Sequence, residues 1–133
     1  MDAAFIPIND PDAYYPSNTI CNTGTSLSTT TSRPGLGTIV NMRGFTTGYT
    51  SGKILNTDAS IKNELGLLIT NMTSAEFPSS GGDSGGIIYT VISSTNARPT
   101  VGVLKGRVVE GTTITLYYSK ADLVLSALGV SRF

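Results

Sequence analysis

The stretch PSSGGDSGGIIYT, residues 78–90, sets an aspartate and a serine between two pairs of glycines, just before an apolar run. Such a glycine-rich turn is a common way to present a nucleophilic serine. A serine hydroxyl becomes a good nucleophile only when a base removes its proton. The sequence contains no histidine, so the most usual base is missing. Ser84 is therefore a candidate nucleophile whose activation needs an explanation.

The glycines around Ser84 fit a second requirement of acyl transfer. Hydrogen-bond donors must point at the oxyanion that develops on the substrate, and glycine permits the tight turns and close approach that this needs. We expect the backbone N–H groups of Gly82 and Ser84 to form this oxyanion hole. The alternative is a glycine-rich β-turn that contains an ordinary serine.

The composition limits the classes of function. The chain has 133 residues, which suits one domain, and its nine basic and nine acidic residues cancel. A neutral chain without a basic run indicates no nucleic-acid partner, and no apolar run is as long as a membrane span. The one cysteine, Cys21, permits no internal disulfide. No residues at ligand spacing indicate a metal or a cofactor.

Short β-branched and aromatic segments, separated by turn residues, follow residue 35. They predict an all-β fold of six strands, either a small barrel or a sandwich, over residues 36–44, 51–57, 64–70, 85–93, 100–106 and 112–119.

The end of the chain has the spacing of a helix. Its apolar positions are Ala121, Val124, Leu125 and Leu128. Ser119 and Asp122 are spaced as in a capping box, and Gly129 is placed to end the helix.

The beginning of the chain has a different character. Residues 1–8 are apolar and precede turn residues, which predicts a buried strand. Residues 17–35 are rich in Ser, Thr, Asn and Gly, which indicates a linker or an irregular loop. The first residues lack the basic segment and the long apolar core of a signal peptide.

The motif GGDSGG, residues 81–86, is similar to the nucleophile motif of chymotrypsin-like serine proteases, in particular the bacterial alpha-lytic protease type. The resemblance covers nearly the whole chain. It includes RGFTTGYTSGKI (residues 43–54), VGVLKGR (residues 101–107) and LYYSKADLVLSALGV (residues 116–130). It implies a six-stranded antiparallel Greek-key barrel, the second barrel of the chymotrypsin fold, with a carboxy-terminal helix.

MDAAFIPI, residues 1–8, resembles the strand that carries the family's catalytic aspartate, which would be Asp2. In this family the histidine precedes that aspartate, in the first barrel. The resemblance therefore implies the carboxy-terminal part of a protease. Residues 1–32 would be the last strand of the first barrel and the linker, and residues 33–133 would be the second barrel and its helix. The resemblance also implies an extracellular protein.

The family keeps the carboxylate at Asp83 buried, where it needs a cation or strong hydrogen bonds. Arg43 matches the arginine that pairs with it in the alpha-lytic type, so an Asp83–Arg43 ion pair is expected.

The resemblance also implies the walls of the substrate pocket, which would be Pro78, Ser79, Ser80, Leu104, Lys105, Gly106 and Arg107. Pro78 stands where the trypsin pattern has an acid, so substrates with Lys or Arg before the scissile bond are not expected. Lys105 stands where the family usually has a serine. Lys105 and Arg107 are either solvated or favour an acidic residue before the scissile bond.

The expected function is that of a serine endopeptidase, which forms an acyl-enzyme on Ser84 and cleaves a peptide or protein substrate. The histidine would come from an upstream barrel, so this chain alone is expected to be nearly inactive. One alternative is a non-catalytic barrel that binds peptides or acts as an interaction module. Another is an unrelated all-β binding protein with a chance motif.

Overall fold

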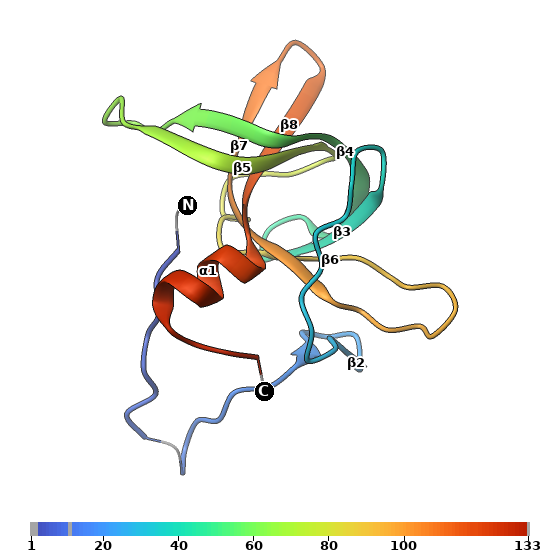
Figure 1. Cartoon of the computed structure of the whole chain (residues 1–133), viewed down its shortest axis with the longest axis vertical. Coiled ribbons are helices and arrows are strands. Elements are labelled where there is room, and N and C mark those ends of the chain that lie inside the picture. Colours follow the sequence, from blue (N-terminus) through green and yellow to red (C-terminus); the bar gives the residue numbers. More distant parts are fainter. Residues whose placement is uncertain (1–2, 11, 133) are drawn as a thin grey trace.

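The computed structural model describes residues 3–10 and 12–132. Six strands close into a barrel, and one helix follows them (Figure 1). The barrel strands are β3 (Ile39–Gly44), β4 (Gly48–Lys62), β5 (Leu68–Glu76), β6 (Ile87–Tyr89), β7 (Thr100–Glu110) and β8 (Thr113–Lys120). The barrel predicted from the sequence is confirmed. No helix in the described ranges is long and apolar enough to cross a membrane.

The strands pair in the order β3-β4-β5-β8-β7-β6, and every pair is antiparallel. β5 and β6 follow each other in the chain but do not pair, which makes the connectivity a Greek key. The connection between them, residues 77–86, crosses one end of the barrel and contains the GGDSGG motif. The topology therefore sets this motif beside β7 rather than beside its neighbours in sequence.

The core follows the alternation of side chains along each strand. On β3 the side chains of Val40 and Met42 are fully buried, and on β8 those of Leu116 and Tyr118 are almost fully buried. The buried cluster consists of Val40, Met42, Ile54, Ala75, Phe77, Ile88, Val101, Leu104, Leu116 and Tyr118. It draws on all six strands and fills the barrel.

The expected strand boundaries differ most from the observed ones at the β4–β5 hairpin. The apolar run of residues 64–70 predicts a strand, yet Leu65 and Leu67 lie in the turn and are 83% and 61% exposed. The side chain of Asn63 accepts hydrogen bonds from the backbone N–H groups of both leucines. Gly66 completes the turn with φ +76°. Local turn chemistry thus outweighs the apolar pattern.

The predicted helix is confirmed as α1 (Ala121–Leu128), and Gly129 ends it in the left-handed region with φ 65°. The predicted capping box is wrong. Lys120 is the residue before the helix, no side chain caps it, and Asp122 forms an ion pair with Arg33 instead. The helix therefore begins one residue later than the capping box requires.

The strand predicted for residues 1–8 is wrong for its described part. Residues 3–8 have no strand structure, and Ile6 is 82% exposed. They form an open trace outside the barrel (Figure 1), where no described strand offers its backbone groups for pairing. The following segment is not wholly irregular, because β1 (Thr19–Ile20) and β2 (Thr25–Ser26) form a short hairpin. The assignment of residues 1–32 to another barrel and a linker stays a prediction.

The core makes a first prediction. Met42→Ala should lower the free energy of unfolding by about 2–5 kcal/mol, because it removes a fully buried side chain and leaves a cavity. Leu65→Ala, at the exposed tip of the β4–β5 hairpin, should change it by less than about 0.5 kcal/mol. Urea denaturation followed by circular dichroism measures both. Equal effects of the two substitutions would contradict the core described above.

Candidate active site

The GGDSGG loop is attached to β7 by its backbone. The N–H of Gly85 donates to the carbonyl of Leu104 (2.8 Å), and the N–H of Leu104 donates to the carbonyl of Gly86 (3.0 Å). Gly82 and Gly85 have φ values of +96° and +83°, which disfavour any residue with a Cβ. The two glycines thus allow the sharp turns that place Ser84 beside Lys105 of β7.

The carboxylate of Asp83 is the most heavily hydrogen-bonded group of the loop, although the residue is only 1% exposed. The donors to Oδ1 are the backbone N–H groups of Thr46 and Thr47, both at 2.9 Å. The donors to Oδ2 are the Thr47 hydroxyl (2.5 Å), the Ser79 hydroxyl (3.1 Å) and the Ser80 N–H (2.8 Å). Asp83 therefore joins the β3–β4 turn to the segment before the motif.

These hydrogen bonds decide the charge of Asp83. Burial by itself would raise the pKa of this carboxyl group, but the hydrogen bonds from Ser80, Thr47 and Thr46 outweigh burial and hold the pKa well below its ordinary value. Asp83 is therefore ionised at neutral pH, and the folded state favours its charged form.

The predicted Asp83–Arg43 ion pair is wrong, because Arg43 points away from the carboxylate. Asp83 lies against Gly44, where a Cβ would overlap its carboxylate. Arg43 is next to Gly44 on β3, so its side chain lies on the opposite face of the strand. There its guanidinium lies near Gly48, 3.8 Å from where a Cβ of that glycine would be. Neutral hydrogen-bond donors therefore stabilise the Asp83 carboxylate in place of the expected arginine.

Ser84 is exposed, and its hydroxyl donates to the backbone carbonyl of Lys105 at 3.2 Å. A carbonyl group cannot act as the base for this serine. The chain has no histidine, and Asp2, the predicted orienting acid, lies outside the described residues. The structure thus presents the hydroxyl at the surface without a base among the hydrogen-bond partners of Ser84.

The two predicted oxyanion donors are free to bind a ligand. The backbone N–H groups of Gly82 and Ser84 donate to no acceptor in the described part of the chain, whereas those of Asp83, Gly85 and Gly86 all have acceptors. Unpaired N–H groups beside a serine hydroxyl are what an oxyanion hole requires.

The expected pocket walls lie beside the motif, although their role as a pocket stays a prediction. One wall, residues 104–107, carries the acceptors for Ser84 and Gly85. The other, residues 78–80, donates to Asp83 through Ser79 and Ser80. The Arg107 guanidinium donates to the Ser79 carbonyl and so connects the two walls.

A cavity of about 460 Å³ opens beside Ser84. Its lining includes Cys21, Arg43, Phe45 and Ile87. Sequence reasoning missed Cys21, since nothing in the polar segment around it indicates an approach to the motif. It also missed Phe45, which is 96% exposed. The signal for Phe45 was present, because a large apolar residue in the turn sequence RGFTTG has no place in the core.

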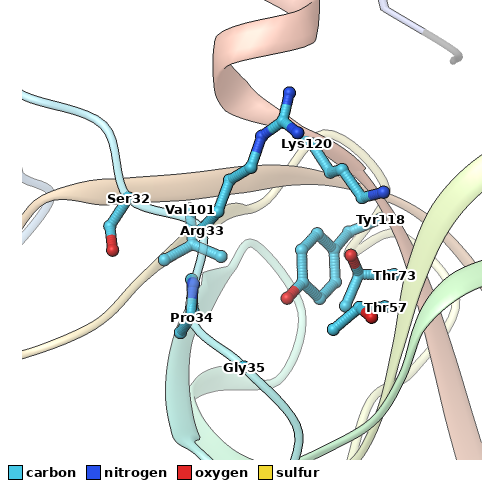
Figure 2. Close-up of a pocket in the computed structure, with 9 residues that line it drawn as sticks. All are labelled: Ser32, Arg33, Pro34, Gly35, Thr57, Thr73, Val101, Tyr118 and Lys120. Carbon is cyan, nitrogen blue, oxygen red and sulfur yellow. The ribbon is translucent and has the colours of Figure 1, made fainter.

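A second cavity, of about 340 Å³, lies between residues 32–35 and strands β4, β5, β7 and β8 (Figure 2). Its two cations have partners: Arg33 pairs with Asp122 (2.5 Å), and Lys120 donates to the Asn71 side chain (2.5 Å). Burial raises the pKa of Tyr118, so this phenol stays protonated. Ser84 lines the other cavity, so the candidate active site is on that side of the barrel. In the described ranges no group of three or more His, Cys, Asp or Glu side chains could hold a metal ion.

The Asp83 cluster makes a second prediction. Asp83→Asn should lower the free energy of unfolding at pH 7 by about 2–4 kcal/mol, because an amide nitrogen cannot accept the bonds that Oδ2 accepts and buried donors lose their partners. Arg43→Ala should have an effect below about 0.5 kcal/mol, since Arg43 does not pair with Asp83. Urea denaturation of both variants measures this. A larger loss of stability in Arg43→Ala would indicate that Arg43 does pair with Asp83.

The pH dependence of this effect has a definite sign. The folded-state pKa of Asp83 is lowered, so its contribution is complete above the unfolded pKa of about 3.9 and is lost as the pH falls below it. The stability difference between the protein and Asp83→Asn should therefore be constant from about pH 5 to 8 and shrink only in stronger acid.

No protein-family model matches the sequence, and no curated protein matches it. Solved structures do match. A chymotrypsin from Cellulomonas bogoriensis has a TM-score of 0.69 and 21% identity over 84% of this chain and 58% of that one. A glutamic acid specific serine protease, which uses a histidine triad in substrate binding, has a TM-score of 0.75 and 23% identity over 92% and 63%. Thermobifida fusca protease A has a TM-score of 0.69 and 23% identity over 84% and 57%.

The chain thus spans between 57% and 63% of the length of these proteases. At such identities the similarity establishes the fold. The barrel order, the closing helix and these matches agree, and the chain has the chymotrypsin-like fold, of which it forms the second barrel and the helix that follows.

Proposed function

We propose that this chain is the nucleophile-bearing part of a serine endopeptidase. The observation that carries the proposal is the exposed Ser84 hydroxyl next to the unpaired N–H groups of Gly82 and Ser84, in a loop fixed by Asp83. The solved structures that match the fold are serine proteases, which supports the same reaction class. The substrate would be a peptide or protein, and the site of action would be extracellular.

In the proposed reaction the Ser84 oxygen attacks the carbonyl carbon of the scissile peptide bond, and its proton passes to a base. The N–H groups of Gly82 and Ser84 stabilise the negative oxygen of the tetrahedral intermediate. The base then returns the proton to the leaving amine as the C–N bond breaks, and an ester to Ser84 remains. Water hydrolyses this ester by the same steps.

The base is the part that this chain does not contain. We propose that a histidine from an upstream barrel supplies it, oriented by Asp2. Without that histidine the oxyanion hole and binding alone leave roughly 10³–10⁴-fold catalysis over water, which is small for an enzyme. The chain alone should be nearly inactive.

One observation favours a second function, a non-catalytic peptide-binding barrel. The Ser84 hydroxyl donates to the Lys105 carbonyl rather than to any base. In this case the loop would bind a peptide carbonyl without attacking it.

A chemical-rescue experiment distinguishes the two proposed functions. A fluorophosphonate probe should label the purified chain slowly, and added imidazole, which fits the cavity of about 460 Å³ beside Ser84, should accelerate the labelling by acting as the missing base. The rate should follow the fraction of neutral imidazole as the pH changes. Mass spectrometry should locate the adduct on Ser84.

Ser84→Ala should abolish the adduct, whereas Ser94→Ala, at an exposed serine in the β6–β7 connection, should retain it. A rate that does not respond to imidazole would favour the peptide-binding function. An adduct that survives Ser84→Ala would exclude Ser84 as the nucleophile.

A further inference from the structure

Arg107 lies on β7, and its side chain reaches Ser79 in the segment before the GGDSGG motif. It pairs with Leu116 on β8, and a bulge between Leu104 and Gly106 shifts the register just before it. Directly paired residues of antiparallel strands share one face of the sheet, and the Leu116 side chain is fully buried in the core. The Arg107 side chain therefore starts from the inward side of β7, although the residue as a whole is exposed.

From this position the guanidinium of Arg107 donates to the carbonyl of Ser79. Ser79 is 4% exposed, and its hydroxyl is bound to Asp83, so the acceptor is fixed. The neighbouring wall residue Lys105 accepts the hydrogen bond of the Ser84 hydroxyl through its carbonyl. The guanidinium therefore lies between the two segments that flank Ser84.

Among the described residues, no carboxylate forms an ion pair with Arg107. The ion pair formed in residues 3–10 and 12–132 joins Arg33 to Asp122, and the partner of Arg107 is a neutral carbonyl group. Asp83, the carboxylate of the GGDSGG loop, accepts its hydrogen bonds from threonine and serine groups. A guanidinium has five N–H donors in a planar fork that matches a carboxylate. Most of the donors of Arg107 are thus available to a ligand.

We propose that Arg107 determines the specificity of this site and selects a substrate with an aspartate or glutamate before the scissile bond. This inference rests on the proposed function, because it places the substrate side chain between residues 78–80 and 104–107. The side-chain carboxylate pairs with the guanidinium, and the chain from Arg107 to Ser79 limits how deep the substrate side chain enters. A lysine or arginine of the substrate is repelled by the same charge.

The test measures binding and so does not depend on catalysis. The peptide amides acetyl-Ala-Ala-Pro-Xaa-NH₂, with Xaa as Glu, Gln or Lys, are titrated into the ¹⁵N-labelled chain and followed by amide chemical shifts. The Glu and Gln peptides differ in charge but hardly in shape. We expect the Glu peptide to bind about tenfold more tightly than the Gln peptide, with the Lys peptide weakest, and shifts centred on residues 78–86 and 104–107.

Arg107→Gln should remove the difference between the Glu and Gln peptides. Arg107→Lys should keep part of it, because an ammonium retains the charge without the fork. The matched control is Arg98→Gln, since the hydrogen bonds of this half-buried arginine go to Asn96, in the β6–β7 connection. The control should leave the preference unchanged, and the amide spectrum of each variant shows whether it is folded.

Equal affinities for the Glu and Gln peptides, a preference that survives Arg107→Gln, or no binding of any peptide would each overturn the proposal. Failure of the proposed function looks different. If the chain prefers the Glu peptide but is never labelled at Ser84, the binding pocket is supported and the proposed reaction is contradicted. If the chain is labelled at Ser84 but shows no preference, the proposed reaction is supported and the role of Arg107 is contradicted.

Discussion

The carboxylate of Asp83 is the group on which the site depends. Its hydrogen bonds tie the β3–β4 turn to the segment before the motif, and Ser84 is the next residue in the chain. The positions of Gly82 and Ser84 are thus determined from both sides of one buried charge. Gly44 contributes by having no side chain, since a Cβ there would overlap the carboxylate. The GGDSGG loop is shaped by contacts within the barrel and its turns.

All the donors to Asp83 are neutral, and this affects the free-energy cost of burying its charge. A buried ion pair must recover the cost of desolvating two charges, whereas here one charge is buried and satisfied by backbone and hydroxyl dipoles. Hydrogen bonds to a charged acceptor are stronger than those to a neutral one, so these neutral donors can together stabilise the buried carboxylate. Arg43 is then free of this role and lines the cavity beside Ser84 instead.

The sequence was sufficient for the architecture and for the motif. Short strands with turns between them predict a closed β fold, and GGDSGG marks a serine in a tight turn. The orientation of Arg43 was predicted wrongly from the sequence. Met42 and Gly44 on either side of it are buried, so the alternation of side chains along a strand places Arg43 on the outer face. The exposed leucines of the β4–β5 turn were misassigned because apolar composition says nothing of the backbone hydrogen bonds that Asn63 organises. The approach of Cys21 to the motif depends on tertiary structure that no local pattern encodes.

The closed barrel has a consequence for assembly. Where the barrel closes, each of the six strands has a hydrogen-bonded neighbour on both sides. A one-sided backbone edge remains only where β4, β5 and β7 extend past the register of one neighbour. Under the proposed function, a second body that completes the site at Ser84 would meet the side chains and loops around that serine. Complementation between two such halves would therefore be governed by surface shape and charge, would weaken or strengthen with ionic strength, and could be redirected by single surface substitutions without disturbing either barrel.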